Sequence, residues 1–108
     1  MRELKFYGAS DDLFEIDDPA GDQEIGCYDT PAIVEVRASS GRLCVVAMYA
    51  PANAVGCWSI GIMPADEDVH MPAWEAKWKL ADRGYSTELT LIVPDDAVVV
   101  VLHPTAED

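Results

Sequence analysis

Basic residues are scarce in this sequence. It contains 7 lysines and arginines against 20 aspartates and glutamates, which gives a formal net charge of −13 over 108 residues. Such a charge repels nucleic acid and anionic membranes and favours a partner with a basic surface. We therefore expect no direct nucleic-acid binding and no membrane association, and we expect a protein partner with a basic surface.

Long hydrophobic runs and a cysteine framework are also lacking. No stretch approaches the roughly 18 apolar residues of a membrane span. The charged start, Met1 to Lys5, is not followed by the apolar run of a signal peptide. Three cysteines, an odd number, do not provide the even set typical of small secreted domains. We expect one domain, residues 1–108, in the reducing cytoplasm of a bacterial or phage-infected cell.

Signatures of catalysis and of cofactor binding are missing as well. The segment around Ser59 reads G-C-W-S-I-G, which does not have the G-x-S-x-G spacing of a nucleophile elbow. No C-x₂-C pair suits zinc, and no glycine-rich loop suits a phosphate or a dinucleotide. We therefore expect a protein that is not an enzyme and that needs no cofactor.

The thiols and imidazoles do not change that expectation. Cys44 and Cys57 lie in apolar stretches, and Cys27 lies among acids. Both settings raise the pKa of a thiol, whereas a nucleophilic cysteine needs a lowered one. The two histidines, His70 and His103, have no signature that pairs either of them with a nucleophile.

Alternation of polar and apolar residues is the dominant pattern, and it is clearest from Trp74 to Leu80. Turn residues such as Ser39-Ser40-Gly41 separate the alternating stretches. The segment 18–31, rich in acids, proline and glycine, is expected to be the longest loop. Strands are predicted at 2–8, 13–17, 32–38, 43–49, 56–63, 74–80, 85–93 and 98–102.

Many short strands with glycine and proline turns indicate an all-β fold. We predict an antiparallel β-sandwich (jelly-roll-like) or a small barrel of about eight strands. The stretch 43–49 is nearly all apolar and is predicted to be a central strand buried on both faces. The predicted core consists of Phe6, Val34, Val36, Val45, Met48, Trp58, Ile60, Trp78, Leu89, Leu91, Val99 and Val101.

The acids are unevenly distributed, and this is the main functional signal. No base lies between Lys5 and Arg37, and a second acidic group recurs at 66–68. We predict an acidic binding surface that meets a basic protein, in one version by imitating the phosphate spacing of DNA. Its candidate residues are Asp11, Asp12, Glu15, Asp17, Asp18, Asp22, Glu24, Asp66, Glu67 and Asp68.

A calcium- or carbohydrate-binding, lectin-like sandwich is the alternative. Crowded loop carboxylates suit Ca²⁺, although the D-x-[DN]-x-[DN]-G pattern is absent. Trp74 and Trp78 could stack on sugar rings if exposed, but their common face is expected to be core. Open sheet edges also suggest a homodimer. The alternative is a monomer, because acidic edges of two copies would repel each other. Residues 6–16 and 58–62 resemble small uncharacterised β-proteins of bacteria and phages, a resemblance that implies no activity.

Overall fold

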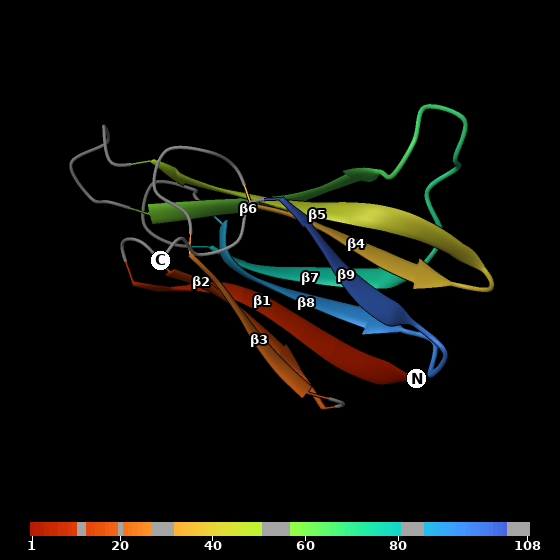
Figure 1. Ribbon diagram of the computed structural model, residues 1–108, viewed down its shortest axis with the longest axis horizontal. Coiled ribbons are helices and arrows are strands. Elements are labelled where there is room, and N and C mark those ends of the chain that lie inside the picture. Colours follow the sequence, from red (N-terminus) through yellow and green to blue (C-terminus); the bar gives the residue numbers. More distant parts are fainter. Residues whose placement is uncertain (11–12, 20, 27–31, 51–56, 81–85, 104–108) are drawn as a thin grey trace.

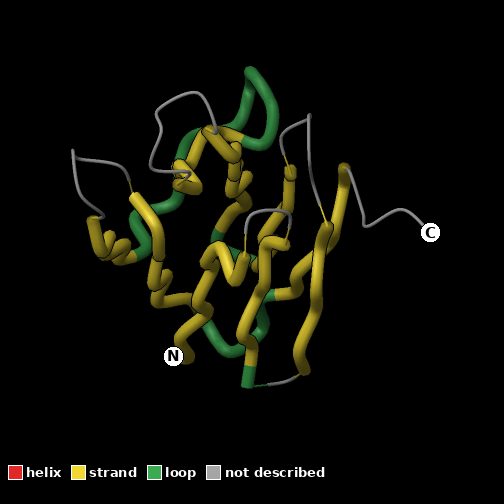
Figure 2. Tube along the Cα trace, turned by 90° about the vertical axis from the view of Figure 1, so that its left-hand side faces the viewer, coloured by secondary structure: helices red, strands yellow, loops and turns green. Residues whose placement is uncertain are grey.

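The protein folds as two facing antiparallel sheets (Figure 1). The residues described by the computed structural model are 1–10, 13–19, 21–26, 32–50, 57–80 and 86–103. Their strands are β1 (Arg2–Ser10), β2 (Leu13–Asp18), β3 (Gly21–Gly26), β4 (Ala32–Ala38), β5 (Gly41–Ala50), β6 (Cys57–Pro64), β7 (Glu75–Leu80), β8 (Ser86–Val93) and β9 (Val98–His103). Figure 2 shows these segments as strands joined by loops.

No helix in the described part of the chain is long and apolar enough to cross a membrane.

Sheet A has the strand order β3-β2-β1-β8-β7, and sheet B has the order β6-β5-β4-β9. Each sheet begins as a meander of consecutive strands, β1 to β3 in one and β4 to β6 in the other. The C-terminal strands then extend both sheets, because β8 pairs with β1 and β9 pairs with β4. The prediction of an all-β antiparallel sandwich is confirmed, and the barrel alternative is wrong because the two sheets stay separate.

The prediction of one long loop over residues 18–31 is wrong in its central part. Gly21–Gly26 is a strand that pairs with β2 from Asp18↔Gly21 to Leu13↔Gly26. Acids and a glutamine occupy most of this segment, glycine stands at both ends, and polar and apolar residues do not alternate along it. A pattern with so little apolar content is typical of a loop, so the ninth strand was not expected from the sequence.

The core lies between the sheets and contains most of the residues predicted for it. Eight of the twelve predicted residues are buried, and Val99 and Val101 are partly buried against the core. Met48 and Trp78 contradict the prediction, because their side chains are 52% and 42% exposed. Met48 lies on the outward face of β5, so this strand is not buried on both sides as predicted. Trp78 belongs to β7, an edge strand of sheet A.

An aromatic cluster fills one part of the core. The Phe6 and Phe14 rings stack at a centroid distance of 6.4 Å, and Phe14 lies 5.7 Å from Trp58. Tyr49 lies 5.6 Å from the other side of Trp58. Gly8 borders the same indole so closely that a Cβ atom there would lie 1.7 Å from Trp58 Cδ1. The absence of a side chain at Gly8 therefore makes room for the tryptophan.

One turn-to-turn hydrogen bond gives a testable pH dependence. The backbone N–H of Ser39, in the β4–β5 turn, donates to Asp96 Oδ2 at 2.9 Å, and this bond holds the pKa of Asp96 below its usual 3.8. A carboxylate whose pKa is lower in the folded state stabilises that state above its unfolded pKa, and this contribution disappears as pH falls through the folded value. Asp96→Asn should therefore lower the free energy of unfolding at pH 7. The difference in stability between this variant and the unmodified protein should disappear in acid. Urea unfolding of both proteins from pH 7 down to pH 2 measures the difference, and a pH-independent difference would contradict the assignment.

Candidate functional site: an acidic hairpin at one edge of sheet A

The structure separates the predicted acidic residues into groups with different settings. Glu15, Asp17, Asp22 and Glu24 lie on the β2–β3 hairpin, at one edge of sheet A. Asp18 ends β2 but is only 7% exposed. Asp11 and Asp12 lie outside the described residues. The remaining acids, 66–68, occupy the connection between β6 and β7.

The register of the hairpin places its acids directly opposite one another. Glu15 pairs with Glu24, and Asp17 pairs with Asp22. Directly paired residues of an antiparallel ladder lie on the same face of the sheet, and like charges in such pairs are unfavourable. We call this set of four residues the acidic hairpin. Glu15 and Asp17 lie on the face turned away from the core, because Phe14 and Ile16 of β2 are buried on the other face, and the register pairs these two acids with Glu24 and Asp22.

Charge changes sign across the outer face of sheet A. Next to the acidic hairpin, Lys5 of β1 pairs with Asp17 in the register, but no ion pair joins Glu15 or Asp17 to a base among the described residues. The far edge is β7, which carries Lys77 and Lys79, and Lys77 Nζ lies 3.5 Å from Glu75 Oε2. The acidic end of this face is therefore the β3 edge.

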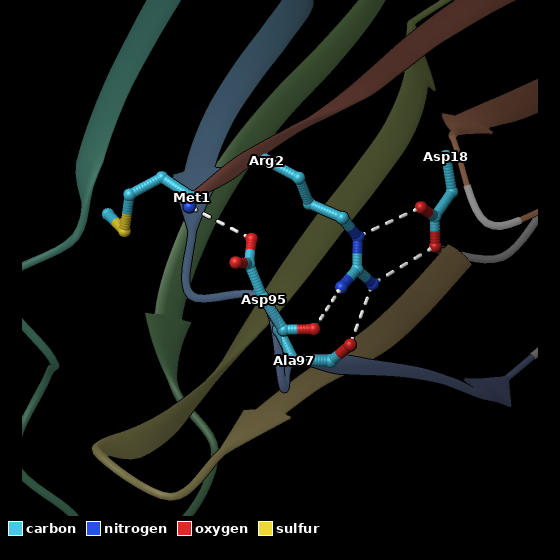
Figure 3. Close-up of polar contacts among 5 residues, drawn as sticks. All are labelled: Met1, Arg2, Asp18, Asp95 and Ala97. Atoms are coloured by element: carbon cyan, nitrogen blue, oxygen red, sulfur yellow. Dashed lines mark hydrogen bonds and ion pairs between the residues drawn. The ribbon is translucent and has the colours of Figure 1, made fainter.

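Asp18 is buried and so does not belong to an exposed acidic surface, contrary to its inclusion among the predicted binding residues. Figure 3 shows its contacts with Arg2. Arg2 Nε lies 3.1 Å from Asp18 Oδ1, and a second guanidinium nitrogen donates to Oδ2 at 3.3 Å. The same guanidinium donates to the carbonyl oxygens of Asp95 and Ala97 at 2.9 and 2.6 Å. Arg2 thus ties the start of β1 and the end of β2 to the turn before β9.

Asp66, Glu67 and Asp68 are exposed and lie apart from the acidic hairpin. Their turn is closed by a hydrogen bond from Val69 N to Asp66 O at 3.0 Å. The turn follows β6, which is the edge of sheet B that packs against β8 and β1 rather than against β3. Figure 1 shows this connection, in green, far from β3. The two acidic segments therefore do not form one continuous patch.

Glu35 is a charged residue on the outer face of sheet B, yet its side chain is only 7% exposed. Arg37 Nε contacts Glu35 Oε1 at 2.6 Å, and Arg42 Nη1 lies 4.0 Å from Oε2. The signal in the sequence is the tight turn at Ser39-Ser40, which pairs Arg37 with Arg42 next to Glu35. On the outer face of sheet B, the Glu35 carboxylate is therefore paired with two half-exposed guanidinium groups.

The described residues contain no cluster of side chains that could hold a metal ion. No three histidine, cysteine, aspartate or glutamate side chains converge among them. Burial, followed by the negative charge of Glu35, raises the pKa of the Cys44 thiol, so it stays protonated at neutral pH. His70 is exposed, and it does not line the hollows of 250 and 390 Å³ that the described residues form beside Met63. Cys27 lies outside the described residues.

Trp78 has a polar role that the alternation did not reveal. Its indole Nε1 donates to the backbone oxygen of Ile60, in β6, at 3.0 Å. The two partners belong to the edge strands of different sheets, so this bond joins β7 to β6 along one side of the sandwich. Trp74 is half-buried and donates from Nε1 to Ser40 Oγ at 3.1 Å. The two indoles therefore have partners within the fold.

Comparison of the chain with protein-family models, with curated proteins and with solved structures finds no match.

Proposed function

We propose that the protein is a non-enzymatic binding module that docks the acidic hairpin of sheet A onto a basic protein surface. The observation that carries the proposal is the register, which opposes Glu15 to Glu24 and Asp17 to Asp22 on one outer face. Like-charged pairs in direct opposition weaken a hairpin by roughly 0.2–1 kcal/mol each. A cationic partner that lies over these pairs converts the repulsion into attraction.

The net charge of −13 supports the same function over a longer range. A surface of one sign steers an oppositely charged partner and accelerates its association, and salt weakens this effect. The smaller set at 66–68 contributes to the general field but lies on a different part of the molecule. In this proposal the acidic hairpin makes the direct contact with the basic partner, and the net charge of the whole chain provides the long-range electrostatic attraction.

The test compares two variants that lose the same charge in different places. The hairpin variant carries Glu15→Gln, Asp17→Asn and Asp22→Asn, and its matched control carries Glu67→Gln, Asp66→Asn and Asp68→Asn. Binding to fluorescent lysine-rich and arginine-rich peptides is followed by anisotropy at low and physiological salt. We expect the hairpin variant to bind about tenfold more weakly, equivalent to about 1.4 kcal/mol, and the control to change much less.

Urea unfolding separates this effect from a loss of structure. Removing like-charge pairs should leave the hairpin variant at least as stable as the unmodified protein. Equal losses of binding in both variants would mean that only total charge matters, and the hairpin would then not be the site.

A further inference from the structure

The outer face of sheet B is apolar, although it is turned away from the core. The residues of β9 that point to it are Val98, Val100 and Leu102, and those of β5 include Val46 and Met48, because the residues that alternate with them pack against the core. Val98, Met48 and Leu102 are 57%, 52% and 48% exposed. An exposed apolar patch of more than a few hundred Å² on a protein marks a contact site for another molecule.

The charges on this face differ from those of the chain as a whole. Among the described residues its charged members are Glu35, Arg37 and Arg42, and the buried carboxylate is paired with both guanidinium groups. The face is therefore net positive by one charge, in a chain with a net charge of −13. Its composition is typical of interfaces between proteins, in which methionine and arginine are enriched and lysine, aspartate and glutamate are depleted.

A second copy of this chain is the occupant that these charges favour. Two chains of net charge −13 repel each other wherever their acids meet. Packing the outer faces of two B sheets together keeps the outer face of each sheet A, with Glu15 and Asp17, on the far side of the pair. A basic partner, in contrast, is repelled by the exposed Arg37 and Arg42 on this face.

The two sides of the face are complementary in shape. The 250 Å³ hollow is lined by residues of β5 and β6, and a Cβ atom at Gly61 in this lining would meet nothing within 4 Å. Leu102 is half-exposed on β9, at the opposite edge of the sheet. The register pairs Ile33 with Val46 and Val46 with Gly61, and Leu102 occupies the bulge beside Ile33. Leu102 and the hollow therefore lie at about the same level along the strands.

A twofold axis parallel to the strands brings these two features together. Such an axis reverses the order β6-β5-β4-β9 in the facing copy, so β9 of each copy lies over β6 of the other. Leu102 of one copy then covers the hollow at Gly61 of the other, twice in each dimer. An axis in the contact plane but perpendicular to the strands would place β6 over β6 and leave both hollows unfilled. Arg37 and Arg42 lie next to the β4–β5 turn, at the rim of the contact.

The size of the face suits a reversible dimer. Its strands, β4, β5, β6 and β9, contain 7, 10, 8 and 6 residues. At about 3.3 Å per residue and about 4.8 Å between strands, they cover about 500 Å². Two copies then contribute about 1,000 Å², which is close to the lower limit for a specific interface. We therefore expect a dimer with a Kd in the micromolar range.

We propose that the protein forms a twofold-symmetric dimer through the outer faces of its two B sheets, with Leu102 of each copy over Gly61 of the other. The inference goes beyond the proposed function and does not depend on it. In the dimer β5 is covered on both faces, which is the environment that its nearly all-apolar segment 43–49 predicts. Glu15 and Asp17 of both copies stay on the outside.

Sedimentation of the full chain from micromolar to millimolar concentration measures the dimer. The interface variant carries Met63→Gln and Leu102→Gln. Its matched control carries Met71→Gln and Leu80→Gln, which replace exposed apolar side chains outside sheet B without changing the net charge either. We expect the interface variant to raise the Kd of the dimer about tenfold and the control to raise it less than about threefold. Urea unfolding verifies that both variants are folded.

Gly61→Leu separates specific packing from general association of apolar surfaces. The substitution adds apolar surface to the face but fills the hollow that receives Leu102. We expect it to raise the Kd about tenfold, whereas a lowered Kd would show non-specific association and would overturn the inference. Added salt should strengthen the dimer, because it screens the repulsion between two acidic chains, and it should weaken the binding of basic peptides.

The outcomes distinguish this inference from the proposed function. The inference is overturned if the unmodified chain stays monomeric at every concentration, or if the control weakens the dimer as much as the interface variant does. A monomeric chain whose hairpin variant loses peptide binding would leave only the proposed function standing. A dimer with the expected responses, in a chain that binds no basic peptide, would leave only this inference standing.

Discussion

Gly8→Ala is expected to destabilise the protein by about 3 kcal/mol or more, at the upper end of the range for an overpacked core. The new Cβ would lie 1.7 Å from Trp58 Cδ1, 2.3 Å from Cγ and 2.5 Å from Nε1. These are ring atoms near the root of the side chain, so no small rotation of a flexible end relieves the contact. The indole is 4% exposed and lies between Phe14 and Tyr49, so it has little room to move.

Gly61→Ala is the matched control for this prediction. Gly61 also lies within a strand, but a Cβ there would meet nothing within 4 Å. Removing the extra backbone freedom of glycine should stabilise the fold by roughly 0.5–1 kcal/mol. The free energies of unfolding of the two variants, measured in urea, should therefore shift in opposite directions from that of the unmodified protein. Equal changes in the free energy of unfolding would show that Gly8 does not accommodate the indole. If Gly8→Ala lowers the free energy of unfolding less in a Trp58→Leu background than in the unmodified protein, the contact with the indole is confirmed.

Alternation of side chains, which follows directly from strand geometry, together with apolar runs such as residues 43–49 and 98–102, predicted eight of the nine strands in the described part of the chain. Alternation predicted β7 and β8 well, since Trp74 to Leu80 and Tyr85 to Val93 alternate over most of their length. It missed β3 because period two shows only where the two faces differ in polarity, and Asp22-Gln23-Glu24 is polar on both.

Alternation also shows which residues share a face but not what covers that face. Trp78 lies on the expected side of β7, yet the strand is at the edge of sheet A and leaves the indole 42% exposed. Met48 is exposed because no layer of the described residues covers the outer face of sheet B. Which strands form the edges is a property of the strand order, and residues far apart in the sequence decide it.

The sequence shows that the candidate site is rich in acidic residues, but it does not show how these residues are arranged in the folded structure. The base-free stretch between Lys5 and Arg37 contains the four acids of the hairpin. Their opposition depends on the β2–β3 register, in which a shift of one residue would turn Asp22 and Glu24 to the other face. The burial of Asp18 depends on Arg2, 16 residues away, and no local pattern relates the two.

Arg2→Ala is expected to lower the free energy of unfolding by about 3 kcal/mol, because breaking a buried ion pair leaves one charge without its partner. The Arg2 and Asp18 side chains are 18% and 8% exposed, so water replaces the lost contact poorly. The carbonyl oxygens of Asp95 and Ala97 lose a donor in the same substitution. For a domain of this size, the loss corresponds to a fall in Tm on the order of 10–20 °C.

Lys5→Ala is the control for this substitution, because Lys5 lies on the same strand with an exposed side chain. It should change stability by no more than about 0.5 kcal/mol. A double-mutant cycle with Asp18→Ala then isolates the pair. The double variant should be less destabilised than the sum of the single variants, because removing both charges leaves neither one buried alone. Strict additivity would mean that Arg2 acts only through the turn carbonyls. A positive coupling would show that Asp18 stabilises the fold through its contact with Arg2.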